Sequence, residues 1–465
     1  MQIPSASLAV RRSIARSAAL CAVSAAVPLV AAVALVAATA LFASCLARAG
    51  AGGAGSAGPS ARGDATTAAP DAALDAALDA PPRAEPGCAT TAEHSAAPGP
   101  AAGVARTAES DRPRETAPGA PPTFVLRDAP LVAFPGAGNP KAGDAGETDS
   151  NSPAHWDGDT LYVFNSAGHP WRSSGPDVFR LGSSYLRVVF DKGASGGRWF
   201  ECTWKHPGGL LYGWYHNEPL GVCPARGTHL TAPRIGAARS ADDGASWEDL
   251  GIVLDAPPGL RCETENRYFA GGNGDFSSIA DEARAYVYFF LSTYGEPAEQ
   301  GVAVARMRYE DLDRPAGKVW KWHRGEWKEP GLGGRLTPIF PAKVDWHRKD
   351  ADAFWGPSVH WNSHLETYVL LLNRAMDCDW NQEGVYVSFN RDLARPEAWS
   401  EPRKILDRAE LVEKTGIATP WYPQVIGLDA ARRETDKLAG RRARLFVRGR
   451  SAWEILFLAP GETAD

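Results

Sequence analysis

The chain has 465 residues, with 49 Lys and Arg against 55 Asp and Glu and a formal net charge of −6. Its length would fit about three domains, and its mild acidity argues against a nucleic-acid partner, because phosphate binding needs a basic face. All 16 Trp and all 12 Tyr lie at or beyond Trp156, and the first 120 residues hold one aromatic residue, Phe42. Such a segment cannot bury enough apolar surface to offset its ordering entropy. We therefore expect one large core within residues 121–465.

The first 49 residues have the layout of an export segment. Three arginines within residues 1–16 precede an apolar run from Ala18 to Ser44, which is the order of regions in a signal peptide. Three endings stay open. A stretch ending at Cys45 resembles a bacterial lipobox, residues 47–49 fit an A-x-A cleavage site, and the run is long enough to remain as a membrane anchor. We expect an exported protein, either a membrane-anchored lipoprotein or a secreted or periplasmic protein, with no other membrane contact.

Residues 50–120 are rich in Ala, Gly, Pro, Ser and Thr. This composition is typical of a disordered, extended spacer, so we expect a tether between the export segment and the domain.

Four of the seven cysteines lie in the predicted domain, at Cys202, Cys223, Cys262 and Cys378. An exported domain can hold disulfides. Cys223–Cys262 is the favoured pair because both residues flank one proposed blade, and buried free thiols are the alternative. The cysteine spacing suggests no zinc site.

Short strands dominate beyond residue 121. Runs such as Tyr286–Leu291 and Tyr368–Leu372 have strand length and composition, and turn residues separate them. Similar stretches recur every 48 to 81 residues, starting at Asn151, Trp199, Asp275, Gly356 and Trp421. Each unit can form a four-stranded antiparallel blade, and blades around an axis leave few exposed edges. The sequence therefore predicts an all-β five-bladed β-propeller, closed by residues near 122–135.

Residues 240–247 fit the pattern S-x-D-x-G-x-x-W, the Asp-box of sialidases and related propellers. We expect a structural turn in which Asp242 binds backbone N–H groups, Gly244 takes a positive φ and Trp247 packs between blades. Such a turn says little about chemistry.

The blade pattern resembles the five-bladed propeller glycoside hydrolases, the arabinanase/β-xylosidase and invertase/levanase relatives. The resemblance covers about 330 residues and rests on the blade rhythm, on the first-strand pattern from Asp149 to Phe164 and on closing segments such as Asn390–Pro402. It implies three carboxylates at the starts of the innermost strands of blades one to three. These are an Asp base or nucleophile, an Asp that tunes pKa values and a Glu acid.

Three acids occupy matching places: Asp149, Glu201 and Asp275. Aligning the blade starts puts the first two at even offsets, and strand side chains alternate with period two. All three are therefore expected to face the central funnel as catalytic residues, where clustering would raise at least one pKa. The order of these acids departs from that of the family, because blades two and three carry Glu and Asp where the family has Asp and Glu. In addition, Asp149 competes with Asn151 for the position in blade one. His216 and Glu218, at the end of the second strand of blade two, are alternates.

Other residues at the expected mouth suit sugar faces and hydroxyls. We expect substrate contacts from His216, Glu218, Asn165, Trp171, Trp355 and Arg374.

The first functional hypothesis is an exported glycoside hydrolase, or a related glycan phosphorylase, acting on a polysaccharide or glycoconjugate. The second is a non-catalytic carbohydrate-binding or cell-surface propeller, because this fold hosts many functions. The third is a sialidase-type enzyme, which would need three arginines in the funnel. We expect a monomer without a cofactor, and a structural Ca²⁺ in the central channel stays open.

Overall fold

The computed structural model describes residues 122–135, 148–182, 186–224 and 230–464. The predicted export segment and tether, residues 1–49 and 50–120, lie outside them. None of the helices in the described ranges is long and apolar enough to span a membrane. Helical structure there consists of α3 (Arg408–Thr415) and the 3₁₀ turns η2 (Pro297–Glu299), η3 (Tyr309–Asp311) and η4 (Pro396–Ala398).

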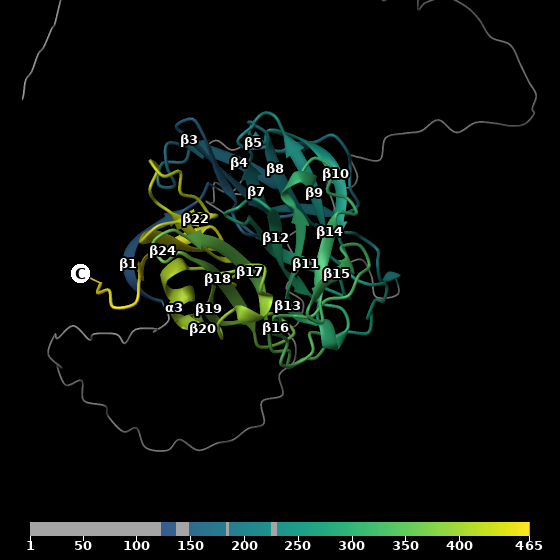
Figure 1. Cartoon of the computed structure of the whole chain (residues 1–465). Coiled ribbons are helices and arrows are strands. Elements are labelled where there is room, and N and C mark those ends of the chain that lie inside the picture. Colours follow the sequence, from purple (N-terminus) through teal and green to yellow (C-terminus); the bar gives the residue numbers. More distant parts are fainter. Residues whose placement is uncertain (1–121, 136–147, 183–185, 225–229, 465) are drawn as a thin grey trace, which may run out of the picture. The chain divides into compact units, whose positions relative to one another are not determined.

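The described strands form five sheets, and each sheet is one blade (Figure 1). Blade one contains β2 (Ala154–Asp157), β3 (Thr160–Ser166), β4 (Pro170–Gly175) and β5 (Leu186–Arg187). Blade two contains β7 (Gly197–Lys205), β8 (Leu211–Glu218), β9 (Arg234–Ser240) and β10 (Ser246–Leu254), with β6 (Val189–Phe190) at its outer edge. Blade three contains β11 (Asn273–Ala280), β12 (Tyr286–Thr293), β13 (Gly301–Arg308), β14 (Val319–His323), β15 (Glu326–Pro330) and β16 (Phe340–Pro341).

The last two blades follow the same antiparallel plan. Blade four contains β17 (Ala353–Asn362), β18 (Thr367–Ala375), β19 (Gln382–Asn390) and β20 (Arg403–Asp407), with β22 (Leu438–Ala439) beside β17. Blade five contains β21 (Pro423–Gly427), β23 (Arg442–Val447), β24 (Arg450–Leu458) and β1 (Thr123–Ala133). The first strands of successive blades contact one another at the axis, from β2 to β7, β11, β17 and β21. The predicted all-β five-bladed propeller is confirmed.

The ring closes between the two ends of the domain. Strand β1 pairs antiparallel with β24, from Thr123 opposite Leu458 to Ala133 opposite Arg450. Figure 1 shows the blue β1 beside the yellow β24. Blade five therefore takes its outer strand from residues that precede blade one, as predicted, and this pairing joins segments more than 300 residues apart in sequence.

The core lies between the blades rather than in one central mass. Strand β12 illustrates why, because its side chains alternate between two interfaces. Val287, Phe289 and Leu291 pack with blade two, whereas Tyr288 and Phe290 pack with blade four. Comparable buried clusters fill the interfaces between blades one and two, four and five, and five and one. Strands buried on both faces explain why the sequence shows long apolar runs in place of alternation.

The turn at residues 240–247 has the geometry expected of it. Asp242 accepts hydrogen bonds from the N–H of Ser246 (2.9 Å) and from its hydroxyl (2.6 Å). Gly244 has φ of +84°. The Trp247 ring is 2% exposed and packs against Phe164 and Phe200 between blades one and two. The turn therefore serves the blade interface.

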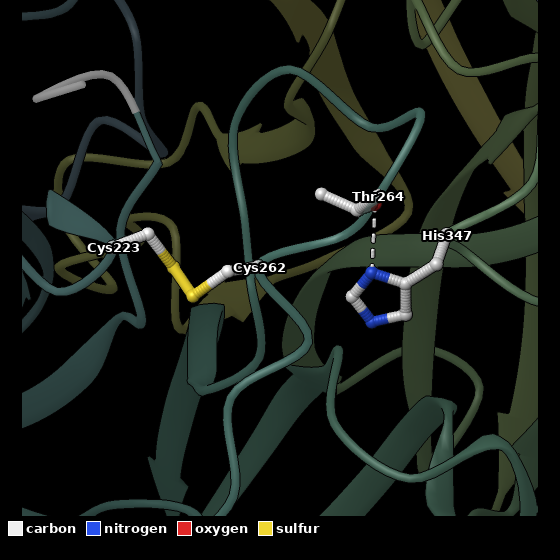
Figure 2. The surroundings of a disulfide bond; sticks show 4 residues. All are labelled: Cys223, Cys262, Thr264 and His347. Carbon is white, nitrogen blue, oxygen red and sulfur yellow. Dashed lines mark hydrogen bonds between the residues drawn. A yellow bond between two sulfur atoms is a disulfide. The ribbon is translucent and has the colours of Figure 1, made fainter. Parts of the chain in front are cut away.

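A disulfide joins Cys223 to Cys262, with their Cα atoms 5.7 Å apart (Figure 2). It ties the segment after β8 to the one between β10 and β11, which confirms the favoured pair. Cys202 is a buried free thiol, which was the alternative expected for these cysteines. Cys378 is disulfide-bonded. The segment between β10 and β11 is thereby fixed to blade two.

Candidate active site

Three buried titratable side chains meet near the propeller axis. The donor atoms of Glu201, His216 and Asp275 all lie within 4.8 Å of one another. Glu201 comes from β7 and Asp275 from β11, the first strands of blades two and three, and His216 comes from β8. Each residue is at most 3% exposed. Two of the three residues predicted to be catalytic therefore lie together, beside one predicted to bind substrate.

Both acids lie where their strands are irregular. The register of β7 against β8 shifts at Glu201, and that of β11 against β12 shifts at Asp275. Asp275 also has φ of +37°. A β-bulge inserts one residue and re-aims its side chain. Unbroken alternation was expected along both strands, whereas equivalent bulges in neighbouring blades bring these carboxyls to the axis.

The carboxylate of Asp275 is held by two phenols. Tyr294 donates its hydroxyl to Oδ2, and Tyr422 donates to Oδ1 at 2.9 Å. Nδ1 of His216 lies 3.8 Å from Oδ1. Burial raises the pKa of Asp275, and the opposing effects of His216 and the phenols do not cancel it. The group is therefore both fixed in orientation and shifted toward protonation.

Glu201 accepts a hydrogen bond from the backbone N–H of Asn151 at 2.8 Å. Burial and the neighbouring charges of Asp275 and Asp149 raise the pKa of Glu201 well above its usual range. The side-chain amide of Asn151 donates to the carbonyls of Phe276 (3.0 Å) and Pro357 (3.2 Å). Asn151 thus links blades one, three and four at the axis, which leaves Asp149 as the acid of blade one.

Asp149 is more open than the other two acids, with 36% of its side chain exposed. The guanidinium of Arg448 lies 3.7 Å from Oδ1 and also donates to the carbonyl of Thr148 at 2.7 Å. The charge of Asp149 raises the pKa values of Glu201 and His216. The third predicted acid is therefore close enough to act on the buried cluster and lies nearer to solvent.

His216 connects the cluster to Glu218. Its Nδ1 accepts the backbone N–H of Asp275 at 2.9 Å, and its Nε2 lies 3.0 Å from Oε1 of Glu218. Burial lowers the pKa of His216, but Glu218 and Asp275 outweigh it and the pKa is raised. Glu218 keeps 30% of its side chain exposed. The two alternates predicted from the sequence thus form one hydrogen-bonded pair at the cluster.

Three residues predicted to contact substrate have partners within the protein. Asn165, 1% exposed, accepts hydrogen bonds from the hydroxyls of Ser152 (2.7 Å) and Thr148 (3.3 Å). Arg374 forms two hydrogen bonds of 2.8 Å with both carboxylate oxygens of Asp352.

Trp355 is 1% exposed and packs against Trp380, with ring centroids 4.6 Å apart. Its indole therefore presents no face to solvent. Trp171 is half-buried in β4, opposite Asn165 of β3.

Two residues of this site, Tyr422 and Arg448, were not predicted from the sequence. Tyr422 immediately precedes β21, so the rule that selected the starts of first strands would have found it. Arg448 lies in the turn between β23 and β24, and no sequence signal distinguishes it from other turn arginines.

The group of Glu201, His216 and Asp275 is also the one place in the described residues where donor atoms could converge on a metal ion. However, both ring nitrogens of His216 and both carboxylate oxygens of Asp275 already have hydrogen-bond partners. A cation would have to displace several of them, so these residues do not fit a resident metal. The structural Ca²⁺ considered for the channel stays a prediction.

No family model matches the sequence, and no curated protein matches it. Among solved structures, the chain is similar to a Cellvibrio cellulosa α-L-arabinanase complexed with arabinohexaose, with 15% identity, a TM-score of 0.38, and coverage of 68% of this chain and 92% of that one. It is also similar to the catalytic domain of a Coprinopsis cinerea GH62 α-L-arabinofuranosidase, with 11% identity, a TM-score of 0.40, and coverage of 67% and 91%.

An exo-β-1,3-galactanase of Phanerochaete chrysosporium with galactose gives 13% identity, a TM-score of 0.40, and coverage of 72% of this chain and 66% of that one. These neighbours are glycoside hydrolases. The five-bladed arrangement of this chain is established by its five described sheets.

Proposed function

We propose that the chain is a glycoside hydrolase. The observation that carries this proposal is the buried pair of carboxyls, Glu201 and Asp275, whose nearest oxygens are no more than 4.8 Å apart. Glycoside hydrolysis needs one protonated carboxyl and one ionised carboxyl with separated pKa values. Two buried carboxyls this close resist ionising together, so their arrangement favours a protonated acid at neutral pH.

Glu201 is the proposed general acid. Its pKa is raised well above the usual range, mainly by burial and then by Asp275, so it retains a proton that it can donate to the leaving oxygen. Asp275 has a supporting role in this scheme. The phenols of Tyr294 and Tyr422 hold both of its oxygens, and its charge tunes Glu201.

Asp149 is the proposed base or nucleophile. Nucleophile and acid carboxyls lie about 5–5.5 Å apart in retaining enzymes, and the base and acid lie farther apart in inverting enzymes. Asp149 is partly exposed, and one of its carboxylate oxygens lies 3.7 Å from the guanidinium of Arg448. It therefore suits the attack on the anomeric centre.

A carbohydrate-binding propeller without catalysis is the second candidate. The observation that favours it is the low exposure of Glu201 and Asp275, at 1% and 3%, because a proton donor must reach the substrate. A sugar that binds without being cleaved would identify this function.

The experiment is a hydrolysis screen of the purified full-length chain against arabinan, β-1,3-galactan and a panel of aryl glycosides. Those two polysaccharides are chosen because the structural neighbours are arabinanases and galactanases. We expect new reducing ends from at least one substrate, and a loss of about 10²–10⁴-fold in the Glu201→Gln variant. An Asp313→Asn variant, far from the cluster, should retain activity. Equal turnover by Glu201→Gln would refute the proposed acid.

We also propose that the protein acts outside the cytoplasm. A disulfide between Cys223 and Cys262 is characteristic of an oxidising compartment. If Cys45 carries a lipid, Cys45→Ala should move the protein from the membrane fraction to the soluble fraction after expression in a bacterial host. An unchanged membrane fraction would instead favour the uncleaved anchor.

A further inference from the structure

The candidate site carries an excess of negative charge. Asp149, Glu201, Glu218 and Asp275 surround His216. The charges of Asp275 and Asp149 raise the pKa of Glu201, and the charge of Glu218 raises the pKa of Asp275. Three arginines of the described residues face carboxylates of their own, whereas Arg234 donates to the side-chain oxygen of Asn217 at 2.9 Å. Arg448 lies 3.7 Å from Asp149, Arg267 lies 3.2 Å from Asp379, and Arg261 lies 2.7 Å from Asp345. A substrate carboxylate would meet net repulsion here, whereas an uncharged sugar would not.

An aromatic corner lies beside these acids. Tyr268 is 41% exposed, and its ring stands at 90° to that of Trp421, with centroids 6.4 Å apart. The indole N–H of Trp421 donates to the carbonyl of Trp380 at 3.0 Å, which fixes the ring. Burial raises the pKa of Tyr268, and the charge of Asp149 raises it further. The guanidinium of Arg448, which lies 3.7 Å from Asp149, is 5.6 Å from the centroid of the Trp421 ring. The aromatic corner and Asp149 therefore share one region.

The segment that carries Tyr268 is anchored at several points. The disulfide Cys223–Cys262 holds its first part, and Arg261 bonds to Asp345 at 2.7 Å. Thr264, in the same segment, is held by His347, whose Nδ1 lies 2.8 Å from Oγ1 of the threonine (Figure 2).

The same histidine is bound on its other side. Its Nε2–H donates to the carbonyl of Tyr294, 2.9 Å away, so Nδ1 accepts from the threonine hydroxyl. The side chain of Asn266 then accepts the backbone N–H of Tyr268 at 2.8 Å. A ring positioned in advance loses little entropy when a ligand binds.

We propose that Tyr268 and Trp421 form a binding wall for the C–H face of an uncharged sugar residue, adjacent to Asp149. This inference rests on the proposed function, since it names the substrate class and a positioning residue of the same site. Sugar C–H groups pack on aromatic faces, and few polar groups are needed to orient them.

The test is affinity electrophoresis of the full-length chain through gels containing arabinan, β-1,3-galactan or polygalacturonate. All proteins carry Glu201→Gln, so that no polysaccharide is consumed. We expect retardation by at least one neutral polysaccharide and none by polygalacturonate. Adding Tyr268→Ala should weaken the binding about tenfold. Tyr268→Phe should restore it, and Trp320→Ala, which removes an aromatic ring 46% exposed on β14, should leave it unchanged.

The inference is overturned if polygalacturonate binds more tightly than both neutral polysaccharides, if no neutral polysaccharide binds, or if Tyr268→Ala binds like its parent. Binding that depends on Tyr268, without cleavage by the wild-type chain, would refute the proposed hydrolase and support the wall. Cleavage by the wild-type chain that Tyr268→Ala leaves unchanged would refute the wall and support the hydrolase.

Discussion

The backbone N–H of Asp275 donates a hydrogen bond of 2.9 Å to Nδ1 of His216. A ring nitrogen that accepts an amide proton carries none itself, so the neutral ring holds its proton on Nε2 and donates it to Glu218. One histidine therefore ties the bulge of blade three to a partly exposed acid on blade two.

Replacing His216 by Ala should leave the buried N–H of Asp275 unpaired. We expect a loss of about 1–3 kcal/mol in the free energy of unfolding for that group, measured by urea denaturation. His206→Ala is the control, because His206 accepts only the N–H of Gly208 in a turn. Equal losses in the two variants would show that the hydrogen bond to Asp275 contributes nothing specific.

Asp275→Asn should abolish turnover and leave the fold nearly intact. The positive φ of +37° at this position is one that Asn tolerates better than most residues, and the amide oxygen can still accept one phenol. We expect the activity to fall by at least about 10²-fold, with a change in unfolding free energy within about 1.5 kcal/mol. A large loss of stability with activity retained would mean that the residue is structural.

The strand pattern allowed the blade architecture to be predicted, because alternation and turn residues are local signals. The alignment of the blade starts and the family resemblance singled out Glu201 and Asp275. Long apolar runs such as β12 indicate strands that are buried on both faces. The number of repeated units indicates the number of blades in the ring. The contacts that fill the site are not local. Tyr422 meets Asp275 across 147 positions, and Arg374 pairs with Asp352 across 22 positions.

Trp355 illustrates the same limit. Its place at the start of a blade suggests a mouth residue, but Trp380 packs over it from a different segment. The two β-bulges that aim Glu201 and Asp275 leave no sequence signature either, apart from the small residue Gly274 before Asp275.

The contribution of Glu201 to the stability of the folded chain should fall as the pH rises above about 4.5. Its folded-state pKa is raised from 4.5, so the unfolded chain releases this proton at a lower pH than the folded chain does. Between the two pKa values the folded state binds more protons, and the free energy of unfolding falls by up to about 1.4 kcal/mol per pH unit.

Glu201→Gln removes this contribution. Urea denaturation at several pH values from 4.5 upward should show the stability of the wild-type chain falling relative to that of the variant. Asp275 contributes the same sign in both proteins, and His155 and His360, whose pKa values are lowered, contribute the opposite sign in both. Parallel curves would mean that Glu201 has the same pKa in the folded and unfolded chains.

Gly244→Ala should be costly and Gly158→Ala mild, although both glycines have positive φ, +84° and +52°. A Cβ on Gly244 would lie 2.2 Å from Cζ of Phe164, whereas one on Gly158 meets nothing within 4 Å. We expect losses of about 2–5 kcal/mol and about 1–2 kcal/mol. Thermal unfolding of the two variants measures the difference, and equal melting temperatures would contradict the packing of this turn between blades.

Azide rescue of Asp149→Ala tests the proposed hydrolysis most directly. Once a cleaved aryl glycoside is known, the variant should lose at least about 10²-fold in kcat, because no ionised carboxylate remains at the anomeric centre. Added azide should then attack that carbon in the space left by the carboxylate, restore release of the aryl group and yield a glycosyl azide. Wild-type turnover by Asp149→Ala without azide would contradict the assignment of Asp149 as base or nucleophile.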